Sequence, residues 1–150
     1  MIDLLGVFLL SSTSVADDAS IFVGEPHEHA WTDIYQTDER QIQFDANYSS
    51  DGEVNEQTYP VALVRVTEWG PKGADSPIRI GVNQHARVAI NCENSAFTPI
   101  EAEVWNRDSE REIVKVPEPQ FVSLRPENKE LLGPLYRHVC GPNWTLEGNQ

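Results

Sequence analysis

Alternating apolar and polar residues predict a largely antiparallel β-sheet in the middle of the chain. The clearest strand is 59–69, because Val61–Val66 is almost continuously apolar and rich in β-branched residues. Segments 40–45, 87–92 and 100–105 alternate with a period of two, which is typical of strands with one buried face. Further strands are expected at 31–35, 78–80 and 112–116. The polar stretch 46–58 is expected to be a long hairpin loop.

The pattern becomes helical near the C-terminus. Between residues 130 and 140 the apolar positions are Leu131, Leu132, Leu135, Tyr136 and Val139. Proline is best tolerated in the first helical turn, so Pro134 predicts a helix that begins just before Gly133. The Gly141-Pro142 pair is a stop signal. The predicted fold is therefore α+β, mainly β: one antiparallel, meander-type sheet with a C-terminal helix packed on one face.

The first 16 residues have the shape of a secretory signal peptide. An apolar run over 2–10 is followed by Ser14 and Ala16, small residues at the positions that precede a cleavage site. No basic residue precedes the run, so a short buried strand is the alternative. We expect a signal peptide over 1–16, a polar lead-in over 17–30 and a single domain over 31–150. Such a protein is exported to the periplasm or the cell surface, and without a cysteine after the leader we expect no lipid anchor.

The chain has two cysteines, Cys92 and Cys140, and they do not form a CxxC motif. An even number of cysteines in an exported protein predicts a disulfide bond, although two separate buried thiols are the alternative. The bond would tie the end of a strand to the predicted helix. Closing this long loop is worth about 4 kcal/mol in the chain-entropy model.

The charge balance narrows the range of partners. Acidic residues outnumber Lys and Arg by 24 to 11, for a formal net charge of -13. Such a surface repels nucleic acid and anionic lipid, so neither is an expected partner, and we expect no insertion into the membrane. The negatively charged surface favours solubility, and it would attract a basic protein or a divalent cation.

One acidic segment has oxygen side chains at the spacing of a calcium-binding loop. The candidate ligands are Asp45, Asn47, Asp51 and Glu56. However, Ser50 stands where such loops need glycine, and the flanking segments are predicted strands rather than helices. A solvated acidic hairpin loop is the favoured interpretation.

A second metal-ligand candidate lies in the lead-in. His27 and His29 are two residues apart, so on an extended chain they point the same way and suit zinc or copper, with Glu28 or another residue as a further ligand. The alternative is a loose polar arm with no ligand.

Catalytic motifs are not evident. The sequence has no Gly-x-Ser-x-Gly, His-Glu-x-x-His or phosphate-binding glycine loop, so we expect neither an enzyme nor a cofactor. Trp105 follows Glu101 and Glu103 on a predicted strand and is a candidate for an exposed partner-binding residue.

Three stretches carry a resemblance to a known family. They are Val88–Cys92, the strand pair 100–105 and 112–116, and the ending Leu135-Tyr136-Arg137-His138-Val139-Cys140. Together they resemble the surface-adhesin protein E family of exported bacterial proteins. The resemblance implies an antiparallel sheet with a disulfide-tethered helix and a non-enzymatic binding role, best known as adhesion to host matrix proteins.

The expected function is therefore a non-catalytic exported binding module that engages an extracellular or host matrix protein. One alternative is an acidic periplasmic inhibitor of a basic secreted enzyme such as lysozyme, because opposite charges speed encounter and orient the partners. A periplasmic enzyme is the more remote alternative, since the many carboxylates include possible catalytic pairs.

Overall fold

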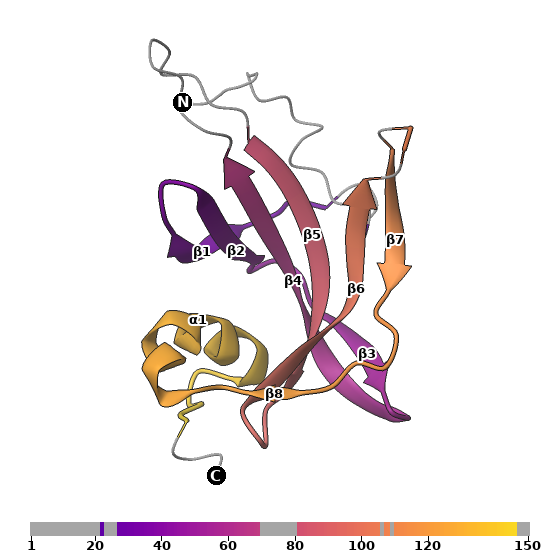
Figure 1. Ribbon diagram of the computed structural model, residues 1–150. Coiled ribbons are helices and arrows are strands. Elements are labelled where there is room, and N and C mark those ends of the chain that lie inside the picture. The colour runs from indigo at the N-terminus through magenta and orange to yellow at the C-terminus, as the bar shows by residue number, and fades with distance from the viewer. Residues whose placement is uncertain (1–21, 23–26, 70–80, 106, 109, 147–150) are drawn as a thin grey trace.

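The computed structural model describes residues 22, 27–69, 81–105, 107–108 and 110–146, without the side chains of residues 81, 82 and 105. The strands are β1 (Trp31–Gln36), β2 (Arg40–Asp45), β3 (Ser50–Val54), β4 (Gln57–Trp69), β5 (Gly81–Asn91), β6 (Ala96–Trp105), β7 (Arg111–Lys115) and β8 (Val122–Ser123). A short 3-10 turn (Pro126–Asn128) leads into α1 (Lys129–Cys140) (Figure 1). The antiparallel strands and the C-terminal helix confirm the predicted fold class, α+β and mainly β. The predicted leader at 1–16 and the predicted strand at 78–80 lie outside the described residues.

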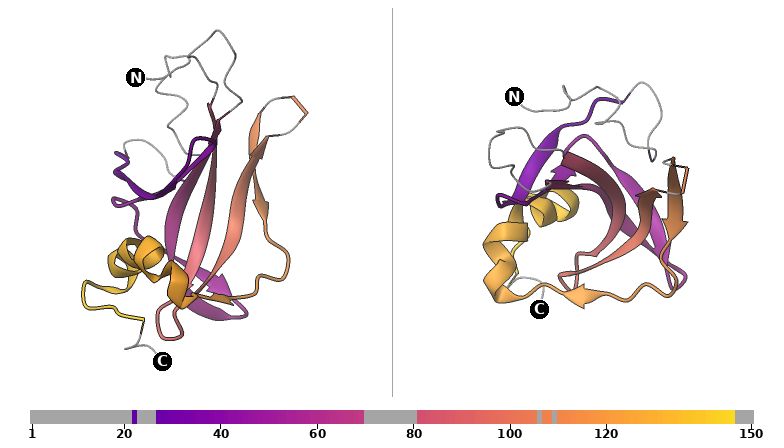
Figure 2. Two further views of the ribbon diagram at one scale, coloured as in Figure 1. Left: turned by 60° about the vertical axis from the view of Figure 1, so that its left-hand side comes forward. Right: turned by 45° about the horizontal axis from the view of Figure 1, so that its top comes forward.

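The sheet is an antiparallel meander with the order β1-β2-β4-β5-β6-β7. One side of β4 and one side of β6 are each shared by two shorter strands. β2 and β3 pair with successive halves of the long β4, and β7 and β8 pair with different parts of β6. The strands curl strongly around the side on which α1 lies (Figure 2). The sheet therefore has one concave face toward the helix, which we call the helix-side face, and one opposite face.

The prediction of a long loop over 46–58 was wrong, because β3 occupies part of it. Asn55 and Glu56 form a tight turn with φ of 52° and 71°, and Val54 pairs with Gln57 across it. Asparagine tolerates the left-handed region well, which favours such a two-residue connection. The sequence pattern did not predict β3 because its outward positions are polar and only Val54 supplies a large apolar side chain to the core.

The two faces of the sheet bury separate cores. On the helix-side face the buried residues are Ile34, Phe44, Ala62, Val64, Ile90, Leu124, Leu135, Tyr136, Trp144 and Leu146. On the opposite face they are Tyr48, Val54, Val61, Leu63, Ala89 and Ile100. β4 contributes to both because successive side chains of a strand point to opposite faces. The nearly continuous apolar run that marked this strand in the sequence thus reflects burial on both sides.

The helix begins at Lys129, earlier than the start predicted from Pro134. Pro134 lies inside α1 and cannot donate the backbone hydrogen bond of a normal helical residue. Tertiary packing offsets this loss, since Leu135 and Tyr136 are buried against the sheet. The helix ends at Cys140, and the N–H of the next residue, Gly141, donates to the carbonyl of Arg137 at 3.1 Å.

The Cys92–Cys140 disulfide is confirmed. It joins the residue that follows β5 to the last residue of α1, with the two Cα atoms 5.7 Å apart and a sequence separation of 48. The bond thereby holds the helix against the helix-side face. Among the described residues, no helix has the length and apolar character needed to cross a membrane.

Candidate functional site

A row of apolar side chains crosses five strands on the helix-side face. In cross-strand register it consists of Phe44, Val64, Ala86, Ala102 and Val114. The exposed fraction rises along the row, from 3% at Phe44 and 9% at Val64 to 44% at Val114. The reason is that α1 packs mainly against β1 and β4, at one side of the sheet. The far end of the row therefore lies open.

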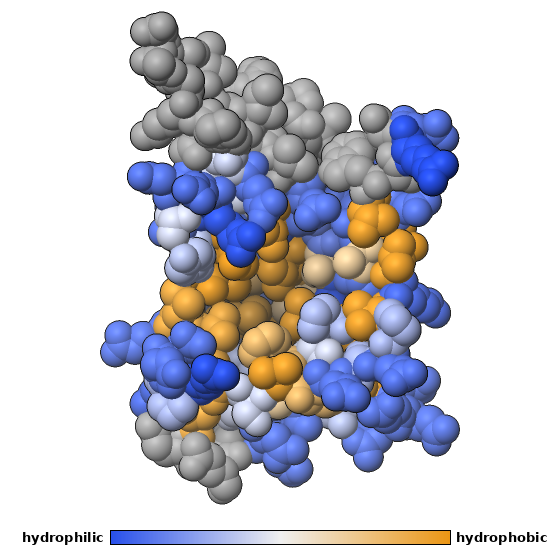
Figure 3. All heavy atoms as spheres, viewed as in Figure 1, coloured by the Kyte–Doolittle hydropathy of each residue, from blue (hydrophilic) through white to orange (hydrophobic). Residues whose placement is uncertain are grey.

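Further apolar residues widen this open surface. Ile42, Val66 and Val88 are only partly buried beside the helix-side core, and Val104 is half-buried on β6. In the space-filling view these strands form a recessed apolar surface above α1, with hydrophilic residues around it (Figure 3). Contiguous apolar surface of this kind on a polar protein marks an interaction site or a ligand groove. We call it the apolar hollow.

The opposite face carries polar side chains at the equivalent positions. Gln43 donates from Nε2 to Asp33 Oδ1 at 2.9 Å, and its Oε1 accepts from Arg65 Nη2 at 2.6 Å. Trp31 covers this pair, with the Arg65 guanidinium carbon 4.3 Å from the ring centroid. Arg65 is thus both hydrogen-bonded and stacked on an aromatic ring.

The same polar row continues into a fully buried pair. His85 Nδ1 lies 2.8 Å from Glu103 Oε1, and both side chains have no exposed surface. Arg111 approaches the other carboxylate oxygen at 3.5 Å. A buried carboxylate is costly unless it is paired, so these contacts hold β5, β6 and β7 in register.

A second ion pair on this face joins Arg87 to Glu101. Arg87 also donates to Tyr48 Oη at 2.9 Å and to Ser50 Oγ at 3.1 Å. Burial lowers the pKa of Arg87, but the hydrogen bonds and charges of Glu101 and Tyr48 outweigh it, so the net pKa is raised. These contacts fasten β3 to the central strands.

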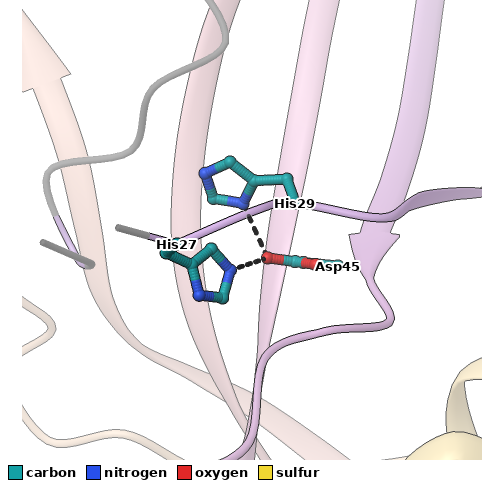
Figure 4. Close-up of side chains that lie close together, drawn as sticks. All are labelled: His27, His29 and Asp45. Carbon is teal, nitrogen blue, oxygen red and sulfur yellow. Dashed lines mark hydrogen bonds and ion pairs between the residues drawn. The ribbon is translucent and has the colours of Figure 1, made fainter. Parts of the chain in front are cut away.

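Two histidines of the lead-in converge on the last residue of β2 (Figure 4). His27 Nε2 and His29 Nδ1 lie 2.8 Å and 2.6 Å from the same oxygen, Asp45 Oδ2. The three side chains are 21%, 12% and 0% exposed, in the order His27, His29, Asp45. Among the described residues this is the one group of three or more His, Cys, Asp or Glu side chains placed to share a metal ion.

The backbone fixes the Asp45 carboxylate in this position. Its other oxygen, Oδ1, accepts from the N–H groups of Ala30 at 2.8 Å and Asn47 at 2.9 Å. Burial raises the pKa of Asp45, but the hydrogen bonds from Ala30, His27, Asn47 and His29 outweigh it, and the net pKa lies below the usual value. Asp45 is therefore a carboxylate held ionised by its surroundings.

The four calcium candidates do not assemble into one site. Asp45 turns toward the histidines, while the amide of Asn47 donates to the carbonyl of Glu28 at 2.8 Å. Asp51 lies on β3 and Glu56 in the turn that follows, both exposed. Neither joins a cluster of potential ligands in the described part of the chain.

Two sequence-based candidates remain: the zinc or copper ligands His27 and His29, and the partner-binding residue Trp105. The structure brings together His27 and His29, the expected zinc or copper ligands, with Asp45 as the third group in place of Glu28. The sequence pattern missed this combination because Asp45 is 16 residues from His29 and reaches it only through the pairing of β1 with β2. Trp105 pairs with Arg111 through the backbone, and its side chain is outside what the structure describes.

Comparisons of the chain with protein-family models, with curated proteins and with solved structures find no match.

Proposed function

We propose that this protein is a non-catalytic exported binding module that holds a protein partner in the apolar hollow. One observation carries the proposal: the apolar row continues across the sheet beyond the cover of α1, so that Val114 is 44% exposed while Phe44 in the same row is buried. Buried strands need such a row for folding. An open continuation contributes little to folding and is suited to contact with another molecule.

The disulfide supports an oxidising compartment, because such bonds are rare in reducing ones. Extracellular matrix proteins are the proposed partner class, as the resemblance to the surface-adhesin protein E family implies. A partner that presents an apolar segment flanked by basic residues would fit both the hollow and a chain of net charge -13.

The test is a binding assay of the oxidised protein against immobilised extracellular matrix proteins at physiological salt. β7 offers a matched pair of variants, because Val114 and Ile113 are adjacent, 44% and 43% exposed, and on opposite faces. We expect Val114→Glu to weaken binding about tenfold or more, and Ile113→Glu to change it by less than about twofold. Equal effects of the two variants would show that the hollow is not the interface.

The charge favours a second candidate, an inhibitor of a basic secreted enzyme such as lysozyme. Attraction between exposed charges is screened by salt, with a Debye length of about 8 Å at physiological ionic strength. Inhibition of lysozyme at low salt that disappears at about 0.5 M salt would support this candidate. Binding to a matrix protein that survives the same salt would support the first.

A further inference from the structure

We infer that His27, His29 and Asp45 form a binding site for a divalent transition-metal ion of the zinc and copper class. The site is separate from the apolar hollow, since it joins the lead-in to the end of β2. A ring nitrogen of His27, a ring nitrogen of His29 and a carboxylate oxygen of Asp45 all lie within 4.8 Å of one another. The nitrogens that face the carboxylate are His27 Nε2 and His29 Nδ1.

The donor set decides which ions fit. Two imidazole nitrogens and one carboxylate oxygen suit Zn²⁺, Cu²⁺ and Ni²⁺, whereas Ca²⁺ and Mg²⁺ require mostly oxygen ligands. Both cysteines are joined in the disulfide and do not compete as thiolate ligands. Three protein ligands leave a further coordination position for water or another molecule. The partial exposure of His27 and His29 gives that position access to solvent.

The present distances need only a small adjustment. Bonds from zinc to histidine nitrogen or carboxylate oxygen are about 2.0–2.2 Å long, so neighbouring ligand atoms on one tetrahedral ion are separated by about 3.3–3.6 Å. The two nitrogens now lie 2.8 Å and 2.6 Å from Asp45 Oδ2, as hydrogen-bonded groups do. To share an ion, the two ring nitrogens would each move away from Asp45 Oδ2 by less than about 1 Å and would also approach each other, since the ligand atoms of the group now lie within 4.8 Å of one another. The ring proton would then be on the nitrogen that faces away from the ion.

The surroundings already hold the ligands in place. Asp45 Oδ1 is bound by two backbone N–H groups, which leaves Oδ2 directed at the histidines. Asn47 holds the carbonyl of Glu28, the residue between them, at 2.8 Å. The His29 ring stacks on Trp31 with the centroids 4.8 Å apart. Fixing ligands by contacts of this kind is a common feature of metal sites, and its loss typically costs about 10–100-fold in affinity.

A bound ion would have a structural consequence for the lead-in. The two hydrogen bonds to Asp45 would be replaced by coordinate bonds, and residues 27–29 would be tied more firmly to β2. Because His29 stacks on Trp31, and Trp31 covers Arg65, the ion would also hold Trp31 in place over the opposite face of the sheet. Binding to the folded chain alone raises its stability by mass action.

The test is calorimetric titration of the oxidised protein, without a histidine tag and after treatment with a chelator, with ZnCl₂. We expect one saturable site per chain, no binding of CaCl₂ or MgCl₂ at the same concentration, and at least about tenfold weaker Zn²⁺ binding in His27→Gln and His29→Gln. His138→Gln is the matched control, because His138 is exposed and outside the cluster. Absence of a saturable Zn²⁺ site, or equal weakening in the control, would overturn the proposal.

A second readout separates metal binding from a merely structural role of the histidines. Cu²⁺ quenches tryptophan fluorescence at short range, and Trp31 is in contact with the proposed ligand His29. We expect quenching that saturates at one Cu²⁺ per chain and is strongly reduced in Trp31→Phe. At a hundredfold excess of Zn²⁺ over Kd, the melting temperature should rise by about 5 °C or more in the parent protein and not in His29→Gln. Unchanged quenching in Trp31→Phe, together with an unchanged melt, would place bound metal elsewhere.

Discussion

The two faces of this sheet are built from the same strands but are closed in different ways. On the helix-side face the cross-strand row is apolar, and α1 covers one end of it while Val114 at the other end is exposed. On the opposite face the corresponding row contains Gln43, Arg65, His85 and Glu103. Gln43 is hydrogen-bonded to Arg65, which stacks on Trp31, and His85 is paired with Glu103. Polar side chains on one face of a sheet can form hydrogen bonds with each other. Apolar side chains leave the solvent only when another element or another molecule packs over them. The helix-side face is therefore the one to which we assign the partner in the proposed function.

The largest expected effect comes from the bond that keeps α1 on its face. Replacing both Cys92 and Cys140 by Ala should lower the free energy of unfolding by about 4 kcal/mol, because the 48-residue separation is no longer closed in the unfolded chain. Urea unfolding of the variant and the oxidised parent measures the difference. A loss below about 1 kcal/mol would show that packing alone holds the helix.

The buried pair on the opposite face should give the next largest effect. Glu103→Leu removes the partner of His85 and Arg111 and should cost about 3 kcal/mol, since it leaves polar groups buried without a counterpart. Glu112→Leu is the matched control, because Glu112 is exposed on β7, and it should change stability by less than about 0.5 kcal/mol. Thermal and urea unfolding distinguish the two. Similar losses would mean that the polar row has no special role.

A smaller effect is expected from the stacked arginine. Arg65→Leu loses the hydrogen bonds to Gln43 and the contact with the Trp31 ring, and should cost about 1–2 kcal/mol. The control is Arg40→Leu. Its ion pair with Glu68 is about half exposed on both sides, and such pairs contribute little to stability. If Arg40→Leu lowered the free energy of unfolding as much as Arg65→Leu, the contact of Arg65 with Trp31 would add nothing to stability.

The smallest effect on stability is expected from substitutions at positions 113 and 114, which test most directly the difference between the two faces of the sheet. Val114→Glu and Ile113→Glu should each change the free energy of unfolding by less than about 0.5 kcal/mol, because both positions are more than two-fifths exposed. Stability that is unchanged in both, with partner binding lost only in Val114→Glu, would establish the hollow as a surface kept for binding. A large loss of stability in Val114→Glu would instead assign the open end of the row to the folding core.

Much of the secondary structure was predictable from the sequence. Period-two alternation located β2, β5 and β6, and the run at Val61–Val66 located β4. β3 was missed because a polar outer side and a single large apolar residue look like a loop. The start of α1 was misplaced because a local rule about Pro134 was overridden by the burial of Leu135 and Tyr136.

The candidate site was predictable only in parts. The spacing of His27 and His29 indicated that the two rings share a side, and the acidic character of Asp45 was evident, but they belonged to two different metal hypotheses. Their meeting depends on the pairing of Trp31 with Asp45 across β1 and β2. Cross-strand register is set by which faces become buried and by turn geometry, and a shift of one residue would turn Asp45 to the other face.

By itself the sequence determined the strand-rich composition of the fold, the C-terminal helix and the pairing of the only two cysteines. These follow from local periodicity and from the chemistry of residue types, which act over a few neighbouring positions. Tertiary structure alone decided that an apolar row would emerge from beneath α1, that a polar row would be closed by Trp31, and that two histidines would meet Asp45. Each of these joins residues far apart in the chain, and their contact depends on register and curvature that no short segment contains.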